Sequence, residues 1–163
     1  MPMPEFVRAL REKIGTDRLW LSGITAVVLR DNEILLARRA DNGAWTPVTG
    51  IIDPGEEPAV AAVREVAEEA GVQTTVEHLV YVHTTGPVHY SNGDSCEYLD
   101  LVFRMRWDAG EPTPADGENS DVRWFPIDDT PELSADMRER IQIAVDYEKH
   151  ARFIGPTASR PAR

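Results

Sequence analysis

The stretch GIIDPGEEPAVAAVREVAEEAGV, residues 50–72, constrains this chain more than any other part of its sequence. Pro58 suits the first turn of a helix, where its missing N–H would lack a partner in any case. Gly71 suits the left-handed residue that commonly follows the end of a helix. The sequence therefore predicts a helix over residues 58–70, preceded by a loop that contains Gly50.

The predicted helix has two contrasting faces. At about 100° per residue, Glu65, Glu68 and Glu69 share one face, although the chain already carries a formal net charge of -11. The opposite face is apolar, and we expect it to be buried. It consists of Ala59, Val60, Val63, Val66, Ala67 and Ala70.

Carboxylates at this spacing repel one another. Each like-charge pair three or four residues apart destabilises a helix by roughly 0.2–0.5 kcal/mol, and Glu68 and Glu69 also approach the negative end of the helix dipole. A divalent cation would turn this repulsion into coordination, and oxygen ligands suit Mg²⁺ or Mn²⁺. The alternative is a solvated acidic face on which Arg64 forms an ordinary surface pair. Helix periodicity alone does not choose between the two.

Strand and helix patterns elsewhere indicate an α+β domain, with helices on both sides of a mixed sheet. The strands over 74–85 and 97–107 are expected to pair as an antiparallel hairpin with a turn at Asn92-Gly93. The other predicted elements are a helix over 5–14, a hairpin of strands 23–30 and 33–39, a short strand over 44–49 interrupted by Pro47, a loop over 108–120, a strand over 121–127 and a helix over 131–151.

The length of 163 residues corresponds to about one domain. We expect an amphipathic helix and lead-in over 1–18, one main domain over 19–154 and a flexible tail over 155–163. No apolar run approaches the roughly 20 residues of a membrane span, and the start does not resemble a secretory signal, so a cytoplasmic protein without membrane contact is expected. The lone Cys96 agrees with a reducing compartment. The net charge of -11 disfavours binding to a nucleic-acid polymer.

The flanking residues favour the metal site over the solvated face, because residues 50–72 resemble the Nudix box at every defined position. In that pattern a glycine and a glutamate precede a group written Arg-Glu-aliphatic-x-Glu-Glu-x-Gly-aliphatic. The matching residues are Gly50, Glu56, Arg64, Glu65, Val66, Glu68, Glu69, Gly71 and Val72. The order of strands and helices is also similar to the Nudix fold, an α/β/α sandwich with a mixed sheet, as in MutT-like and ADP-ribose-pyrophosphatase-like members.

The resemblance implies roles for the charged residues of the box. Glu68 and Glu69 would be the principal metal ligands. Glu65 would be a further ligand, or the base that deprotonates or orients the attacking water. Arg64 would orient Glu65, and Glu56 would brace the loop through a salt bridge to Arg64.

Residues outside the helix are also implied at the metal. Thr49 would lend its backbone carbonyl, and the adjacent Gly50 is counted with it. Family members often add an acid from a downstream loop, and Glu118 is the first candidate here. Asp121 and Asp116 follow it, and solvated loop acids are an equal alternative for all three.

The implied activity is Mg²⁺- or Mn²⁺-dependent hydrolysis of a pyrophosphate bond in a small nucleotide. The nucleotide would be a nucleoside diphosphate linked to another moiety, such as ADP-ribose, or a (deoxy)nucleoside triphosphate. One alternative is a catalytically silent Nudix-like sensor or scaffold, and another is a plain metal-binding or interaction domain. Family habit and the amphipathic segment over 5–14 also suggest a homodimer.

Markers of substrate class conflict in this sequence. Pro87, which marks ADP-ribose enzymes, and Tyr90, which marks dinucleoside polyphosphate enzymes, both follow the box at the appropriate distance. Arg38 or Arg39 would pair with a terminal phosphate, and strand alternation places one of them in solvent. The aromatic residues that would either stack a base or pack in the core are Trp20, Trp45, Tyr81 and Tyr90. His83 and His89 flank the same loop, and a structural role is expected for them.

Overall fold

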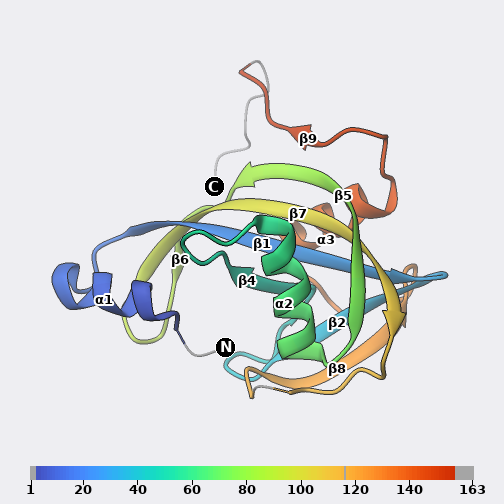
Figure 1. Ribbon diagram of the computed structural model, residues 1–163, viewed down its shortest axis with the longest axis horizontal. Helices are drawn as coiled ribbons and strands as arrows, with labels where there is room; N and C mark the ends of the chain where they lie inside the picture. Colours follow the sequence, from blue (N-terminus) through green and yellow to red (C-terminus); the bar gives the residue numbers. More distant parts are fainter. Residues whose placement is uncertain (1–2, 116, 157–163) are drawn as a thin grey trace.

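A computed structural model describes residues 3–115 and 117–156, and in this part of the chain a mixed nine-stranded sheet lies between two helices (Figure 1). The elements follow in the order α1 (Glu5–Ile14), β1 (Leu19–Arg30), β2 (Glu33–Arg39), β3 (Trp45–Thr46), β4 (Val48–Ile51), α2 (Pro58–Ala70), β5 (Gln73–Thr84), β6 (Val88–His89), β7 (Ser95–Ala109), β8 (Asn119–Pro126), α3 (Ala135–Val145) and β9 (Arg152–Phe153).

The two faces of the sheet each bury a separate apolar core. On one face α2 packs Val66 and Ala70 against residues of β1, β2 and β7. On the other face α3 packs Ile141 and Ala144 against a second cluster from the same strands. The predicted α+β class and α/β/α sandwich are therefore confirmed (Figure 1).

The long strand β1 organises the sheet. It runs parallel to β7 along one edge, and β7 pairs in turn with β5 in the predicted antiparallel arrangement. Along its other edge β1 pairs with β2 only at Leu29 and Arg30, and with β4 over Gly23–Ala26. Beyond that point β2 leaves β1 and pairs with β8 and β3. As a result, β4 lies beside a central strand and delivers the loop before α2.

Several predicted boundaries change. The strand expected over 44–49 is two strands separated by Pro47, because proline has no N–H for a ladder. The helix expected over 131–151 spans only Ala135–Val145, because Ser134 caps its first turn by accepting from Met137 N and Asp146 forms the C-cap. Strand β8 begins at Asn119, inside the predicted loop over 108–120.

The apolar stripe predicted for α2 is largely wrong. Val60 is 58% exposed and Val63 is 36% exposed. Ala59 and Ala67 are exposed as well. The buried side consists of Ala61, Ala62, Glu65, Val66, Glu69 and Ala70. The helix turns two of its glutamates toward the sheet, where other residues satisfy them, and a wheel drawn from the sequence alone does not contain those partners.

Helix α1 occupies the predicted range and packs on its own domain. Val7 is buried with Leu19, Leu21 and Cys96. Arg11 joins the helix to the start of β7, donating to the Ser95 carbonyl at 2.9 Å.

The suggested homodimer stays a prediction. Of the tail, residues 157–163 lie outside the described part of the chain. No described helix has the length and apolar character needed to cross a bilayer.

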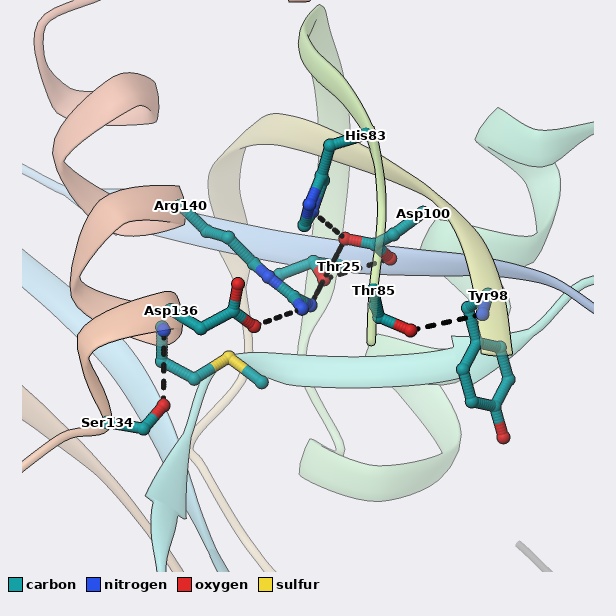
Figure 2. Close-up of polar contacts among 9 residues, drawn as sticks. Thr25, His83, Thr85, Tyr98, Asp100, Ser134, Asp136 and Arg140 are labelled. Carbon is teal, nitrogen blue, oxygen red and sulfur yellow. Dashed lines mark hydrogen bonds and ion pairs between the residues drawn. The ribbon is translucent and has the colours of Figure 1, made fainter. Parts of the chain in front are cut away.

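A buried polar network attaches α3 to the sheet (Figure 2). Arg140 Nη1 lies 3.1 Å from Asp100 Oδ2 and donates to Thr25 Oγ1 at 2.7 Å. His83 Nε2 lies 3.1 Å from the same Asp100 oxygen, and Asp136 binds the other end of the guanidinium. His83 therefore has the expected structural role.

We expect Arg140→Met to lower the free energy of unfolding by about 3–5 kcal/mol, because it leaves the Asp100 carboxylate buried without its cation. Urea denaturation measures the change. Arg152→Met is the matched control, since Arg152 pairs with Glu148 on the surface and its side chain is 47% exposed. Its loss should stay within about 1 kcal/mol. Equal losses in the two variants would contradict a structural role for the network.

Candidate metal centre

The centre forms where β4 turns into α2, with Gly50 and Glu65 in direct contact. A Cβ at position 50 would overlap the Cγ, Cδ and Oε1 atoms of Glu65. Position 50 therefore has to be glycine for the Glu65 side chain to lie across the strand. In this position Glu65 is only 1% exposed.

Arg64 holds the acidic side chains of the box together. Its Nε and Nη2 donate to the two oxygens of Glu56 at 2.7 and 2.8 Å. Its Nη1 donates to Glu65 Oε1 at 3.0 Å and to Glu68 Oε2 at 3.3 Å. The guanidinium hydrogen bond lowers the pKa of Glu56. The predicted salt bridge between Glu56 and Arg64 is present, and Arg64 contacts Glu65 as expected.

Glu69 and Glu68 differ in environment. Glu69 is 5% exposed, and its Oε2 accepts a hydrogen bond of 2.8 Å from Nδ2 of Asn119, which is 7% exposed. The side chain of Glu68 is 44% exposed. The sequence does not point to Asn119, and its neighbour Glu118 is the residue predicted as an additional metal ligand. No spacing or composition signal distinguishes position 119, because the contact joins residues 50 positions apart.

The electrostatics of Glu65 suit a cation. Burial raises its pKa to about 7, and the charges of Glu69 and Glu68 act in the same direction, while Arg64 opposes the shift. Its Oε2 is buried and has no hydrogen-bond partner. A buried carboxylate oxygen without a donor is a costly arrangement, and a divalent cation is the kind of partner that would satisfy it.

The carboxylates of the box are nevertheless not gathered around one point in the described part of the chain. Within residues 3–115 and 117–156 no three His, Cys, Asp or Glu side chains converge closely enough to enclose an ion. Arg64 Nη1 lies against both Glu65 and Glu68, which accounts for their orientation. The donor set of hard oxygens fits Mg²⁺ or Mn²⁺, and the Glu68 carboxylate is the exposed member of this set.

The backbone at Thr49 agrees with the role predicted for its carbonyl. Ile52 N donates to the Ser22 carbonyl at 3.0 Å, which makes residues 22 and 52 a hydrogen-bonded pair of the β1–β4 ladder. Thr49 is opposite Thr25, three positions further along, and is therefore at a non-hydrogen-bonded position. Its carbonyl points away from β1.

Two of the three other predicted acids lie in the described part of the chain. Glu118 is exposed and immediately precedes Asn119. Asp121 pairs with Arg123 at 2.5 Å on the β2–β8 ribbon. Asp116 lies outside the described residues. The roles of these three acids stay predictions.

The residues considered for substrate contact separate into buried and exposed groups. Trp45 packs against Phe125, and Tyr81 is buried in a stack with His83. Trp20 is 56% exposed and Tyr90 is 38% exposed. These two are the aromatic candidates that remain accessible.

Strand alternation correctly separated the two arginines at the end of β2. Arg38 is exposed, whereas Arg39 is half-buried and forms two hydrogen bonds with Asp41, at 2.9 and 2.6 Å. Pro87 is exposed in the loop before β6, and His89 is exposed on β6 itself, where it pairs with Ser95 of β7.

The sequence of this chain is similar to a known protein family and to several of its members. A family model described as NUDIX domain matches residues 20–144. The chain is 35% identical over 115 residues to the NAD-capped RNA hydrolase NudC of Pseudomonas syringae pv. syringae (strain B728a), covering 67% of this chain and 37% of that protein. It is 31% identical over 138 residues to the 8-oxo-dGDP phosphatase NUDT18 of Homo sapiens, covering 79% and 40%. The chain thus spans less than half the length of these curated relatives.

A solved structure supports the same likeness. The UDP-X diphosphatase crystal structure superposes with a TM-score of 0.63 at 25% sequence identity, covering 86% of this chain and 68% of that one.

We expect Gly50→Ala to displace Glu65 and to destabilise the protein by about 1–3 kcal/mol, because the new methyl group would overlap the Glu65 side chain. Urea denaturation and titration with Mn²⁺ measure the two effects. Gly155→Ala is the control, since a Cβ there meets nothing within 4 Å. A Gly50→Ala variant with wild-type stability and Mn²⁺ affinity would contradict the packing described here.

The stability of the metal-free protein should depend on the ionisation of Glu65. Its folded pKa of about 7 exceeds the ordinary value of 4.5, so the folded protein binds more protons between these values. The free energy of unfolding should therefore fall as the pH rises through this window, with roughly 3 kcal/mol lost above it. Urea denaturation in EDTA from pH 5 to 8 measures the slope. Glu65→Gln should remove this component, and parallel curves for the two proteins would refute the assignment.

Proposed function

Since this chain belongs to the Nudix family, we propose that it is a divalent-metal-dependent pyrophosphohydrolase that cleaves a P–O–P bond in a small nucleotide. The observation that carries the proposal is the buried, unpartnered Oε2 of Glu65, beside Glu69 and next to the Arg64 guanidinium. This oxygen needs a positively charged partner that the described residues do not supply. Mg²⁺ or Mn²⁺ is the proposed ion, because all the donors are oxygens.

The charged residues of the Nudix box have different proposed roles. Glu65, Glu68 and Glu69 would hold the ion, together with the Thr49 carbonyl. A bound divalent cation neutralises diphosphate charge and lowers the pKa of a coordinated water. Arg64 keeps Oε1 of Glu65 engaged, so that Oε2 is the oxygen presented to the site. Glu56 fixes Arg64 from the other side.

Glu65 has two proposed roles, as ligand or as the base that accepts a proton from the attacking water. The pKa of about 7 belongs to the metal-free protein and does not choose between the two roles, because a bound cation would lower it. Gly50 contributes by leaving room for the Glu65 side chain.

The proposed substrate is a nucleoside diphosphate linked to another group, such as ADP-ribose, or a (deoxy)nucleoside triphosphate. The names of the relatives refer to NAD-capped RNA, 8-oxo-dGDP and UDP-X, all of which contain a diphosphate. A net charge of -11 disfavours contact with a long RNA chain, so a small nucleotide is preferred. A silent sensor is the competing proposal, and the complete set of box acids favours catalysis.

Turnover decides between catalysis and sensing. We expect at least one member of a panel of nucleotide sugars, dinucleotides and nucleoside triphosphates to be cleaved with Mg²⁺ or Mn²⁺. Glu65→Gln and Glu69→Gln should each lower kcat by about 100-fold or more, while substrate binding changes far less. Glu57→Gln is the matched control, because Glu57 is exposed and its side chain makes no cap hydrogen bond. If the whole panel yields no cleavage products although nucleotides bind, the sensor proposal replaces this one.

A further inference from the structure

Asn119 is a buried polar residue that lies outside the box and contacts one of its glutamates. It is the first residue of β8, and its Nδ2 donates to Glu69 Oε2 at 2.8 Å. Asn119 is 7% exposed and Glu69 is 5% exposed, so little water competes for this hydrogen bond. The contact ties the sheet lobe formed by β2 and β8 to the last turn of α2.

A bulge in β8 turns Asn119 toward Glu69. Ala37 pairs with Val122 and Arg38 with Asp121, but Arg39 pairs with Asn119, so Ser120 is an extra residue. Val122 belongs to the core beneath α2. Strict alternation would place Asn119, three residues before Val122, on the opposite face. The bulge restores it to the face that α2 covers, in the way that bulges commonly redirect side chains near active sites.

The chemistry of an amide suits this place. An N–H directed at a carboxylate favours its ionised form and fixes one of its two oxygens. Unlike a guanidinium, an amide adds no net charge that would compete with a cation. Arg64 donates to Glu65 and Glu68, and Asn119 gives Glu69 a donor that carries no charge.

We propose that Asn119 is a positioning residue for Glu69, whose buried carboxylate it holds in one orientation toward a divalent cation. The inference rests on the proposed metal-dependent function. It adds that the affinity of the centre depends on a residue of the sheet, 50 positions from Glu69 in sequence. Partners that orient a metal ligand typically contribute about 10- to 100-fold to metal affinity.

The test is Mn²⁺ binding to the full chain, followed by the EPR signal of free Mn²⁺. Asn119→Leu keeps the side-chain size and removes the donor, so its Kd should rise about 10- to 100-fold. Asn119→Gln keeps the amide and should recover part of this loss. Gln142→Leu is the matched control, because it removes an exposed amide-to-carboxylate hydrogen bond, from Gln142 Nε2 to Asp146 Oδ2 on α3, and it should bind Mn²⁺ as the wild type does. In a Glu69→Gln background, Asn119→Leu should have no further effect.

The outcomes separate this inference from the proposed function. If the wild-type chain does not bind Mn²⁺, the metal centre itself is refuted. If the wild type binds but folded Asn119→Leu stays within about twofold of it, or if the losses from Asn119→Leu and Glu69→Gln multiply, only the positioning role is refuted. Thermal unfolding of the metal-free variants checks folding. If Asn119→Leu does not unfold cooperatively, Asn119→Ala replaces it in the same cycle.

Discussion

The contact between Glu65 and Gly50 is the constraint on which the rest of the site depends. A carboxylate that is 1% exposed, with an unpartnered oxygen, is costly for a folded protein. Two features reduce that cost. Arg64 supplies charge to one oxygen, and the absent side chain at position 50 supplies space. The other oxygen is the basis of the proposed function, because a cation there would complete what the protein leaves unsatisfied.

The arrangement of the sheet explains how this contact is built. Strand β1 shares one edge between β2 and β4, so the loop before α2 starts beside the centre of the sheet. Where β2 leaves β1, it carries β8 with it, and the bulge at Ser120 directs Asn119 to the far end of α2. The helix is thus joined to the sheet by polar contacts at Arg64, which donates to the Ile51 carbonyl at 3.3 Å, and at Glu69, in addition to the apolar contacts of Val66 and Ala70.

The opposite face of the sheet has its own buried polar network, in which Arg140 joins Asp100 and Thr25. Thr25 pairs with Thr49 in the β1–β4 ladder, so the strand that carries the predicted carbonyl ligand lies beside a strand that takes part in this network. Each helix is therefore attached to the sheet by an arginine or a carboxylate as well as by its apolar side chains. Buried charges of this kind are strongly destabilising when one partner is removed.

The sequence by itself determined the layers and the bounds of α2 through periodicity and caps, and the family through the fixed spacing of the box. The pairing of Glu56 with Arg64 was implied by the resemblance to that family. The sequence did not determine which side of α2 is buried. The spacing of the apolar residues predicts that they form the buried side of the helix. In the structure the sheet covers Glu65 and Glu69 and leaves Val60 and Val63 exposed. Nor did the sequence identify Asn119 or the short β9, since both depend on contacts between distant segments. Residue spacing predicts which side chains share one face of a helix. Only the tertiary structure decides which face is buried and which distant residues contact it.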